Sequence, residues 1–156
     1  MAKGKIGETG QGKSDGRGKK YFTLHSKSPE KPQTTIFQVI ADRLRSKPRM
    51  TRSDKWKKRP VIVKWYAWKD LVALSYRRTK GRSYVCPVAM SYEFYLKDKR
   101  RIDLDNLIKG INDALLGLAF ADDDVKHIKK IDCAEAFIFP SLEEEKAIIT
   151  IRPLSS

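Results

Sequence analysis

The feature that most constrains this fold is an amphipathic helical stripe that directly follows a long apolar segment. In residues 104–118, apolar side chains recur every three or four positions, the spacing that places them on one face of an α-helix. The preceding segment, Val88–Leu96, is apolar and rich in aromatic residues, which predicts a strand. A helix with one apolar face needs a covering layer, so the chain must fold in layers. The stripe consists of Leu104, Leu107, Ile108, Ile111, Leu115 and Leu118.

The other predicted elements complete an α+β pattern. Strands are predicted over 36–41, 125–139 and 147–151, and Gly117 is expected to end the helix of residues 104–118. The order strand, helix, strand, helix, strand, strand predicts a mixed β-sheet with two main helices packed on it. The first of these helices is predicted over 61–77 from a stripe of Val61, Trp65, Trp68, Val72 and Tyr76.

Charge divides the chain into two parts and indicates the partner. Residues 1–34 form a basic extension rich in Gly and Lys, too polar to form a core and predicted to be flexible. Residues 35–156 are predicted to fold as one domain. The formal net charge of +14 favours nucleic acid as the partner. No apolar run is long enough to span a membrane, and Cys86 and Cys133 lack metal-ligand spacing, so we expect a cytoplasmic protein with reduced core cysteines.

Residues 43–59 carry nine basic side chains and a single acid. They also include Met50 and Trp56, and cations beside an aromatic ring are typical of nucleic-acid contacts. A second basic group precedes residue 103. The predicted DNA-binding residues are Arg49, Arg52, Lys55, Lys99, Arg100 and Arg101.

Acidic residues cluster at two places in this basic chain. Asp103 and Asp105 precede or open the helix of residues 104–118, and Asp122–Asp124 follow it. We expect the two clusters to lie near one edge of the sheet. Hard oxygen ligands without soft ones favour Mg²⁺, with Mn²⁺ as a substitute. Lys109 lies one turn after Asp105, where it could hold a phosphate.

Each acidic residue also has a structural interpretation. Asp103 could cap the helix, and Asp105 could favour the positive end of its dipole. Asp105 and Lys109 could form an ordinary surface ion pair. Asp122–Asp124 could be a solvated turn. Spacing alone does not decide between the structural and the catalytic interpretation.

Two blocks of this sequence resemble the RusA-like Holliday junction resolvases. The first runs from Arg101 through the Asp-Leu-Asp-Asn-Leu segment to Lys109, followed by Asp113-Ala114-Leu115 and the acidic run that ends at Asp124. The second, residues 47–56, resembles the N-terminal loop of phage-borne members. The resemblance covers about residues 37–154. The extension before Thr34 matches nothing in the family.

The resemblance implies a homodimer that cuts four-way DNA junctions symmetrically with Mg²⁺, in a bacterial or phage-infected bacterial cell. It implies Asp103 and Asp105 as metal ligands and Lys109 as the catalytic lysine. The third metal-binding and catalytic aspartate is either Asp123, which we favour, or Asp124.

Two alternatives remain. One is a restriction-type nuclease that uses Glu144 and Lys146 with an upstream aspartate. The other is a phage DNA-binding protein that keeps the fold but does not cut DNA.

Overall fold

A computed structural model describes residues 33–56 and 59–154 of the chain. The described residues belong to one compact unit, which begins at residue 32. Most of the predicted basic extension, residues 1–34, therefore lies outside the described residues. The elements follow the predicted order, with one added 3-10 helix: β1 (Thr35–Ala41), η1 (Arg52–Lys55), α1 (Pro60–Arg78), β2 (Val88–Leu96), α2 (Leu104–Leu115), β3 (Ile128–Ile138) and β4 (Glu145–Pro153).

The four strands form one mixed sheet in the order β1-β4-β2-β3. Strand β4 pairs antiparallel with both β1 and β2, whereas β2 and β3 are parallel. Two register shifts in the β2–β3 pair make β3 irregular, in agreement with the bend expected for residues 125–139. The α+β prediction with two main helices is thus confirmed.

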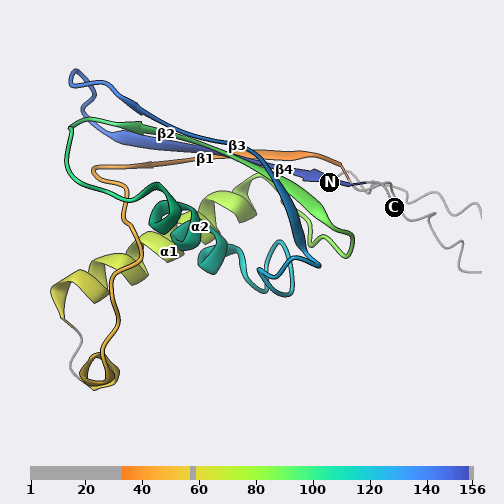
Figure 1. Cartoon of the computed structure of the whole chain (residues 1–156), viewed down its shortest axis with the longest axis horizontal. Coiled ribbons are helices and arrows are strands. Elements are labelled where there is room, and N and C mark those ends of the chain that lie inside the picture. Colours follow the sequence, from red (N-terminus) through yellow and green to blue (C-terminus); the bar gives the residue numbers. More distant parts are fainter. Residues whose placement is uncertain (1–32, 57–58, 155–156) are drawn as a thin grey trace, which may run out of the picture. The chain divides into compact units, whose positions relative to one another are not determined.

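Both helices cover the same face of the sheet (Figure 1). Alternate residues of β2 and β4 point into this layer and are buried, which forms most of the core with the helices. The opposite face carries half-buried and exposed side chains. In the described parts of the chain, no helix has the length and apolar character needed to cross a membrane.

Helix α1 begins at Pro60, a residue whose fixed φ suits the first helical position. Its buried face consists of Ile62, Trp65, Trp68, Val72 and Tyr76. The predicted stripe was wrong at Val61, which is 48% exposed, because the neighbouring Ile62 lies closer to the face that packs on the sheet.

Helix α2 ends at Leu115, earlier than the predicted stripe, which ran to Leu118. Gly117 adopts a φ of 73°, in the left-handed region that glycine enters without steric cost. Leu118 and Ala119 then donate backbone hydrogen bonds to the Leu115 carbonyl, which closes the end of the helix. Gly117 therefore stops the helix, as predicted.

The two cysteines are free, and both are half-buried. Cys86 packs against the edge of the core, but Cys133 lies on the irregular edge strand β3 outside the core cluster. The reduced state of the two cysteines stays a prediction, whereas a full core position is wrong for both.

Candidate active site at the ends of helix α2

Asp103 occupies the N-cap position of α2, but its side chain does not act as a cap. The residue has extended backbone angles, and its carbonyl accepts the first backbone hydrogen bonds of the helix, from Asn106 and Leu107. An N-cap carboxylate normally accepts a backbone N–H from the first turn. Among the described residues, the Asp103 carboxylate accepts a single hydrogen bond, of 3.2 Å, from the Asn106 side-chain amide. The exposed carboxylate therefore keeps most of its capacity to bind another group.

Asp105 and Lys109 lie one turn apart on the same exposed face of α2. The Lys109 ammonium donates a 3.0 Å hydrogen bond to the Asp105 carboxylate, and both side chains are more than half exposed. This contact lowers the pKa of Asp105 from its ordinary value, so the carboxylate is ionised at neutral pH. An exposed pair of this kind stabilises a helix little. A phosphate or cation can therefore separate the pair at small cost.

Among the described residues, the acidic run beyond α2 contains two engaged carboxylates, Asp122 and Asp124, and one that accepts no hydrogen bond, Asp123. Asp124 accepts hydrogen bonds from the backbone N–H groups of Lys126 and His127 and from the His127 ring, and the His127 contact is the main cause of its lowered pKa. Asp122 accepts the backbone N–H of Asp123. No interaction among the described residues engages the exposed carboxylate of Asp123. Of the two candidates for the third ligand, Asp123 has the more available side chain.

The expectation that both acidic clusters lie near one edge of the sheet is wrong within a single chain. Because β2 and β3 are parallel, the segment that leaves β2 and the segment that enters β3 lie at opposite ends of the sheet. Helix α2 connects them, and its 12 residues span about 18 Å. Asp103 and Asp105 thus lie at the start of α2, and Asp122–Asp124 lie in the segment between the end of α2 and β3. Figure 1 shows these two segments at opposite ends of the helix. Among the described residues, no three acidic, His or Cys side chains come together as a metal site.

Arg100 has a role that the sequence analysis did not predict. Its guanidinium forms two hydrogen bonds with the carboxylate of Glu145, one at 2.5 Å, and a third, at 2.7 Å, with Asp98. The Glu145 carboxylate also accepts the backbone N–H groups of Leu44, at 2.7 Å, and Lys97, at 3.2 Å. This geometry gives Arg100 a structural role in place of the predicted DNA contact.

The ion pair between Arg100 and Glu145 fixes the loop that carries Asp103. Glu145 is 0% exposed. Burial would raise its pKa, but the hydrogen bonds from Arg100 and the two backbone N–H groups outweigh burial and lower it. A sequence signal existed for this residue. Glu145 has the same alternation as Ala147, Ile149 and Ile151, which are all buried, so an acid in that register needed an internal partner.

The other predicted DNA-binding residues lie on two exposed segments. Lys99 and Arg101 are exposed in the loop between β2 and α2. Arg49, Arg52 and Lys55 lie between β1 and α1, the last two within η1. This segment is anchored on α2, because the backbone N–H of Lys47 bonds to the Asn106 carbonyl and the Lys47 ammonium pairs with Asp113 at 2.6 Å.

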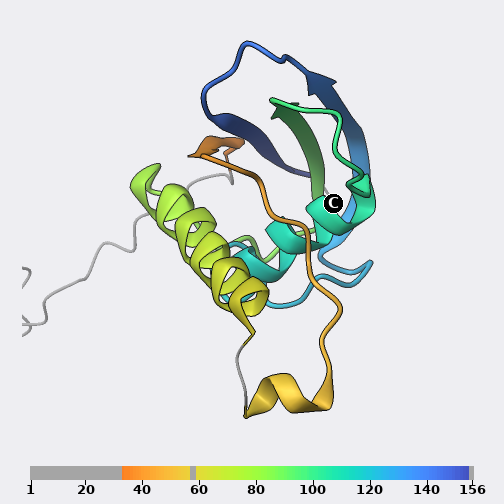
Figure 2. The ribbon, with the colours of Figure 1, turned by 90° about the vertical axis from the view of Figure 1, so that its left-hand side faces the viewer.

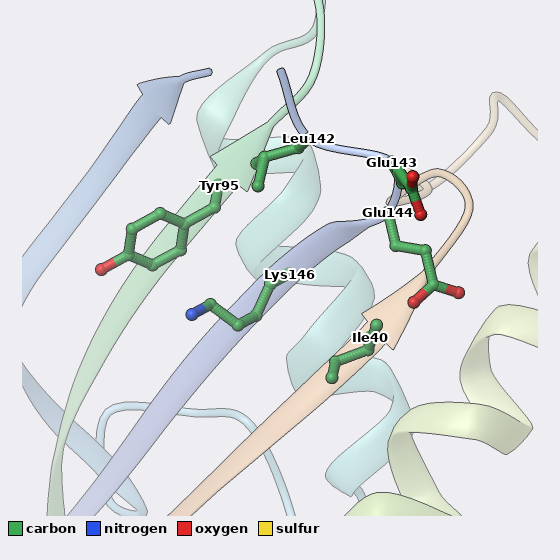
Figure 3. A pocket seen from close by; sticks show the side chains of 6 residues that line it. All are labelled: Ile40, Tyr95, Leu142, Glu143, Glu144 and Lys146. Carbon is green, nitrogen blue, oxygen red and sulfur yellow. The ribbon is translucent and has the colours of Figure 1, made fainter. Parts of the chain in front are cut away.

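The alternative pair, Glu144 and Lys146, lines a shallow hollow of about 280 Å³ at the start of β4 (Figure 3). The Lys146 ammonium lies 4.6 Å from the ring centre of Tyr95, which is a cation–π contact. The described residues that line this hollow include no aspartate: Ile40, Tyr95, Leu142, Glu143, Glu144 and Lys146. The upstream aspartate that the restriction-type hypothesis needs is therefore missing from the lining.

Comparison with models of protein families gives a match that covers most of the chain. The sequence model of the endodeoxyribonuclease RusA family matches residues 42–152, which is most of the chain and includes both acidic clusters. No curated protein matches the chain.

Proposed function

Because the chain belongs to the RusA endodeoxyribonuclease family, we propose that it resolves four-way DNA junctions by paired cleavage with Mg²⁺. The main support is the set of carboxylates at the two ends of α2 that the fold leaves available. In the part of the chain that the structure describes, the Asp103 side chain has no backbone partner although the residue occupies a capping position. The chain has a net charge of +14, so cationic partners are abundant. If these carboxylates only stabilised the fold, we would expect them to be paired with a cation or a backbone N–H.

The donor chemistry fits a hard divalent cation. Asp103, Asp105 and Asp123 offer only carboxylate oxygens, which Mg²⁺ and Mn²⁺ prefer. When bound, the cation supplies charge neutralisation at the phosphate and activation of water. Lys109 would hold a phosphate oxygen beside Asp105 and stabilise the charge that develops there. Arg101, exposed just before Asp103, would contact the neighbouring backbone phosphate.

A second copy of the chain would complete this site. About 18 Å of helix separates the two acidic clusters, so one chain cannot offer all three carboxylates to one cation. A two-fold axis perpendicular to α2 would place the start of one α2 beside the end of the other. Asp103 and Asp105 of one chain would then lie near Asp123 of the other. Two such sites related by symmetry also suit a four-way junction, which offers two equivalent phosphates.

The cleavage experiment uses the full chain with a synthetic four-way junction and a linear duplex, each with MgCl₂ or EDTA. We expect paired cuts in the junction with MgCl₂ alone. Binding without cutting under all conditions would instead support the non-catalytic DNA-binding alternative.

A mixed-dimer experiment tests whether the site is shared. Asp103→Asn and Asp123→Asn chains are given different tags and co-expressed, and the doubly tagged dimer is isolated. If each site takes residues from both chains, this dimer retains one intact site and should nick the junction, whereas each variant alone should not cut. An inactive mixed dimer would show that each site lies within one chain. A protein that cuts the junction but is a monomer by light scattering would also contradict the proposal.

A further inference from the structure

The segment between β1 and α1 projects away from the sheet and the helices, with η1 at its far end (Figure 2). We call the described part of this segment, residues 48–56 together with Arg59, the projecting loop. Trp56, directly after η1, is 82% exposed and is the most exposed aromatic side chain among the described residues. Met50, on the other limb, is 41% exposed. A large exposed aromatic ring on a projecting segment is typical of a binding surface.

A buried carboxylate in η1 holds the far end of the projecting loop together. Asp54 is only 7% exposed and pairs with Arg59 through two hydrogen bonds of 2.6 and 2.7 Å. It also accepts hydrogen bonds from the backbone N–H and the hydroxyl of Thr51. Arg59 in turn donates to the Arg49 carbonyl at 3.0 Å, which links the outgoing and returning limbs. Trp56 is therefore presented by a segment whose two limbs are tied together.

The charge around Trp56 selects the type of partner. Residues 43–59 contain nine basic side chains and a single acid, and that acid is already paired with Arg59. Arg49 and Arg52 are exposed close to Trp56 in the chain. Cations that hold the phosphates beside a ring that stacks on a base are the usual elements of single-strand recognition.

A base is accessible for stacking only where it has left the duplex stack. The bases of a continuous duplex are covered on both faces by their neighbours, so an exposed tryptophan finds no free base face there. At the branch point of a junction, neighbouring bases can unstack. We propose that Trp56 stacks on an unpaired or unstacked base at the branch point and thereby favours branched DNA over linear duplex.

This inference takes its substrate from the proposed junction function but concerns binding, so its test needs no cleavage. The full chain and its Trp56→Ala and Trp56→Phe variants are titrated in EDTA with a four-way junction, a linear duplex and a single-stranded oligo(dT). Trp56→Ala should weaken junction and oligo(dT) binding about tenfold, since one base stack has about this value. Duplex binding should change less than twofold. Trp56→Phe retains a ring and should recover most of the affinity.

Intrinsic fluorescence provides an independent measurement. Trp65 and Trp68 are 3% exposed, so quenching by oligo(dT) should report mainly on Trp56 and disappear in the Trp56→Phe variant. The matched control is Arg52→Gln, which removes a phosphate contact and should weaken junction and duplex binding by similar factors.

Three results would overturn the inference: equal junction binding by wild type and Trp56→Ala, equal losses on junction and duplex, or a change of oligomeric state in Trp56→Ala. The last result would assign Trp56 to contact between copies of the chain. A protein that needs Trp56 for oligo(dT) binding but cuts no junction with Mg²⁺ would support this inference and contradict the proposed function.

Discussion

Glu145 and Asp103 are two carboxylates at the same end of the molecule with opposite environments. Arg100 links the two residues. Its guanidinium pairs with Glu145, and it lies three residues before Asp103 in the sequence. Glu145 is completely buried and accepts hydrogen bonds from a guanidinium and two backbone N–H groups. Asp103 is exposed and accepts one side-chain amide.

This difference distinguishes a carboxylate that stabilises the fold from one that can bind a ligand. A buried carboxylate without these donors would carry a large desolvation cost, so Glu145 is tied to the stability of the fold. The Asp103 carboxylate contributes little to the fold and is free to bind a ligand. Substitutions at the two positions should therefore affect different measurements.

The largest expected effect is on cleavage by Asp103→Asn. We expect a loss of about 1000-fold in the rate of junction cutting, since a metal ligand is lost, while the melting temperature stays unchanged. Asn and Asp are equally good N-caps, so a purely capping role would leave cutting near normal. Cleavage time courses and thermal denaturation of the same preparation distinguish the two roles.

The next largest effect is on stability in Glu145→Gln. The variant leaves Arg100 without its buried charge partner, and we expect the free energy of unfolding to fall by about 3 kcal/mol. Urea denaturation measures this loss. The matched control is the exposed neighbour Glu144→Gln, which should unfold and cut DNA like the wild type. Loss of cutting in that control would revive the restriction-type alternative.

The ion pair between Arg100 and Glu145 also predicts how the stability of the protein depends on pH. The pKa of Glu145 is lower in the folded protein than its ordinary value of 4.5. The stabilisation is therefore fully present above pH 4.5 and is lost as the pH falls through the folded pKa. The stability difference between wild type and Glu145→Gln should be constant near neutral pH and shrink below about pH 4.5. A difference that stays constant down to pH 3 would show that the charge on Glu145 is not its source.

The smallest expected effect on stability comes from a comparison of the two candidates for the third ligand. Asp124→Ala removes the acceptor for two backbone N–H groups and should lower the melting temperature by about 2 to 4 °C. Asp123→Ala should leave the melting temperature unchanged but abolish cutting, whereas Asp124→Ala should still cut. The opposite result would make Asp124 the ligand and Asp123 a solvated turn residue.

Local patterns in the sequence determined the elements of this protein. The order of strands and helices, the buried stripe of α2 and the stop at Gly117 all follow from side-chain periodicity and backbone preference. The family resemblance followed from residues close together in the chain, and the family match over residues 42–152 confirms it. These features need no knowledge of distant contacts.

Only the tertiary structure decided how distant segments meet. Arg100 and Glu145 are 45 residues apart, and their pairing depends on β4 lying beside β2 in the sheet. The parallel pairing of β2 and β3 places the two acidic clusters at opposite ends of α2. The strand–helix–strand connection favours parallel strands, but only the structure shows that these two strands are neighbours in the sheet. Periodicity reports which face of an element is buried, but strand order sets which side chains share a site. That order is a property of non-local pairing, which no local pattern encodes.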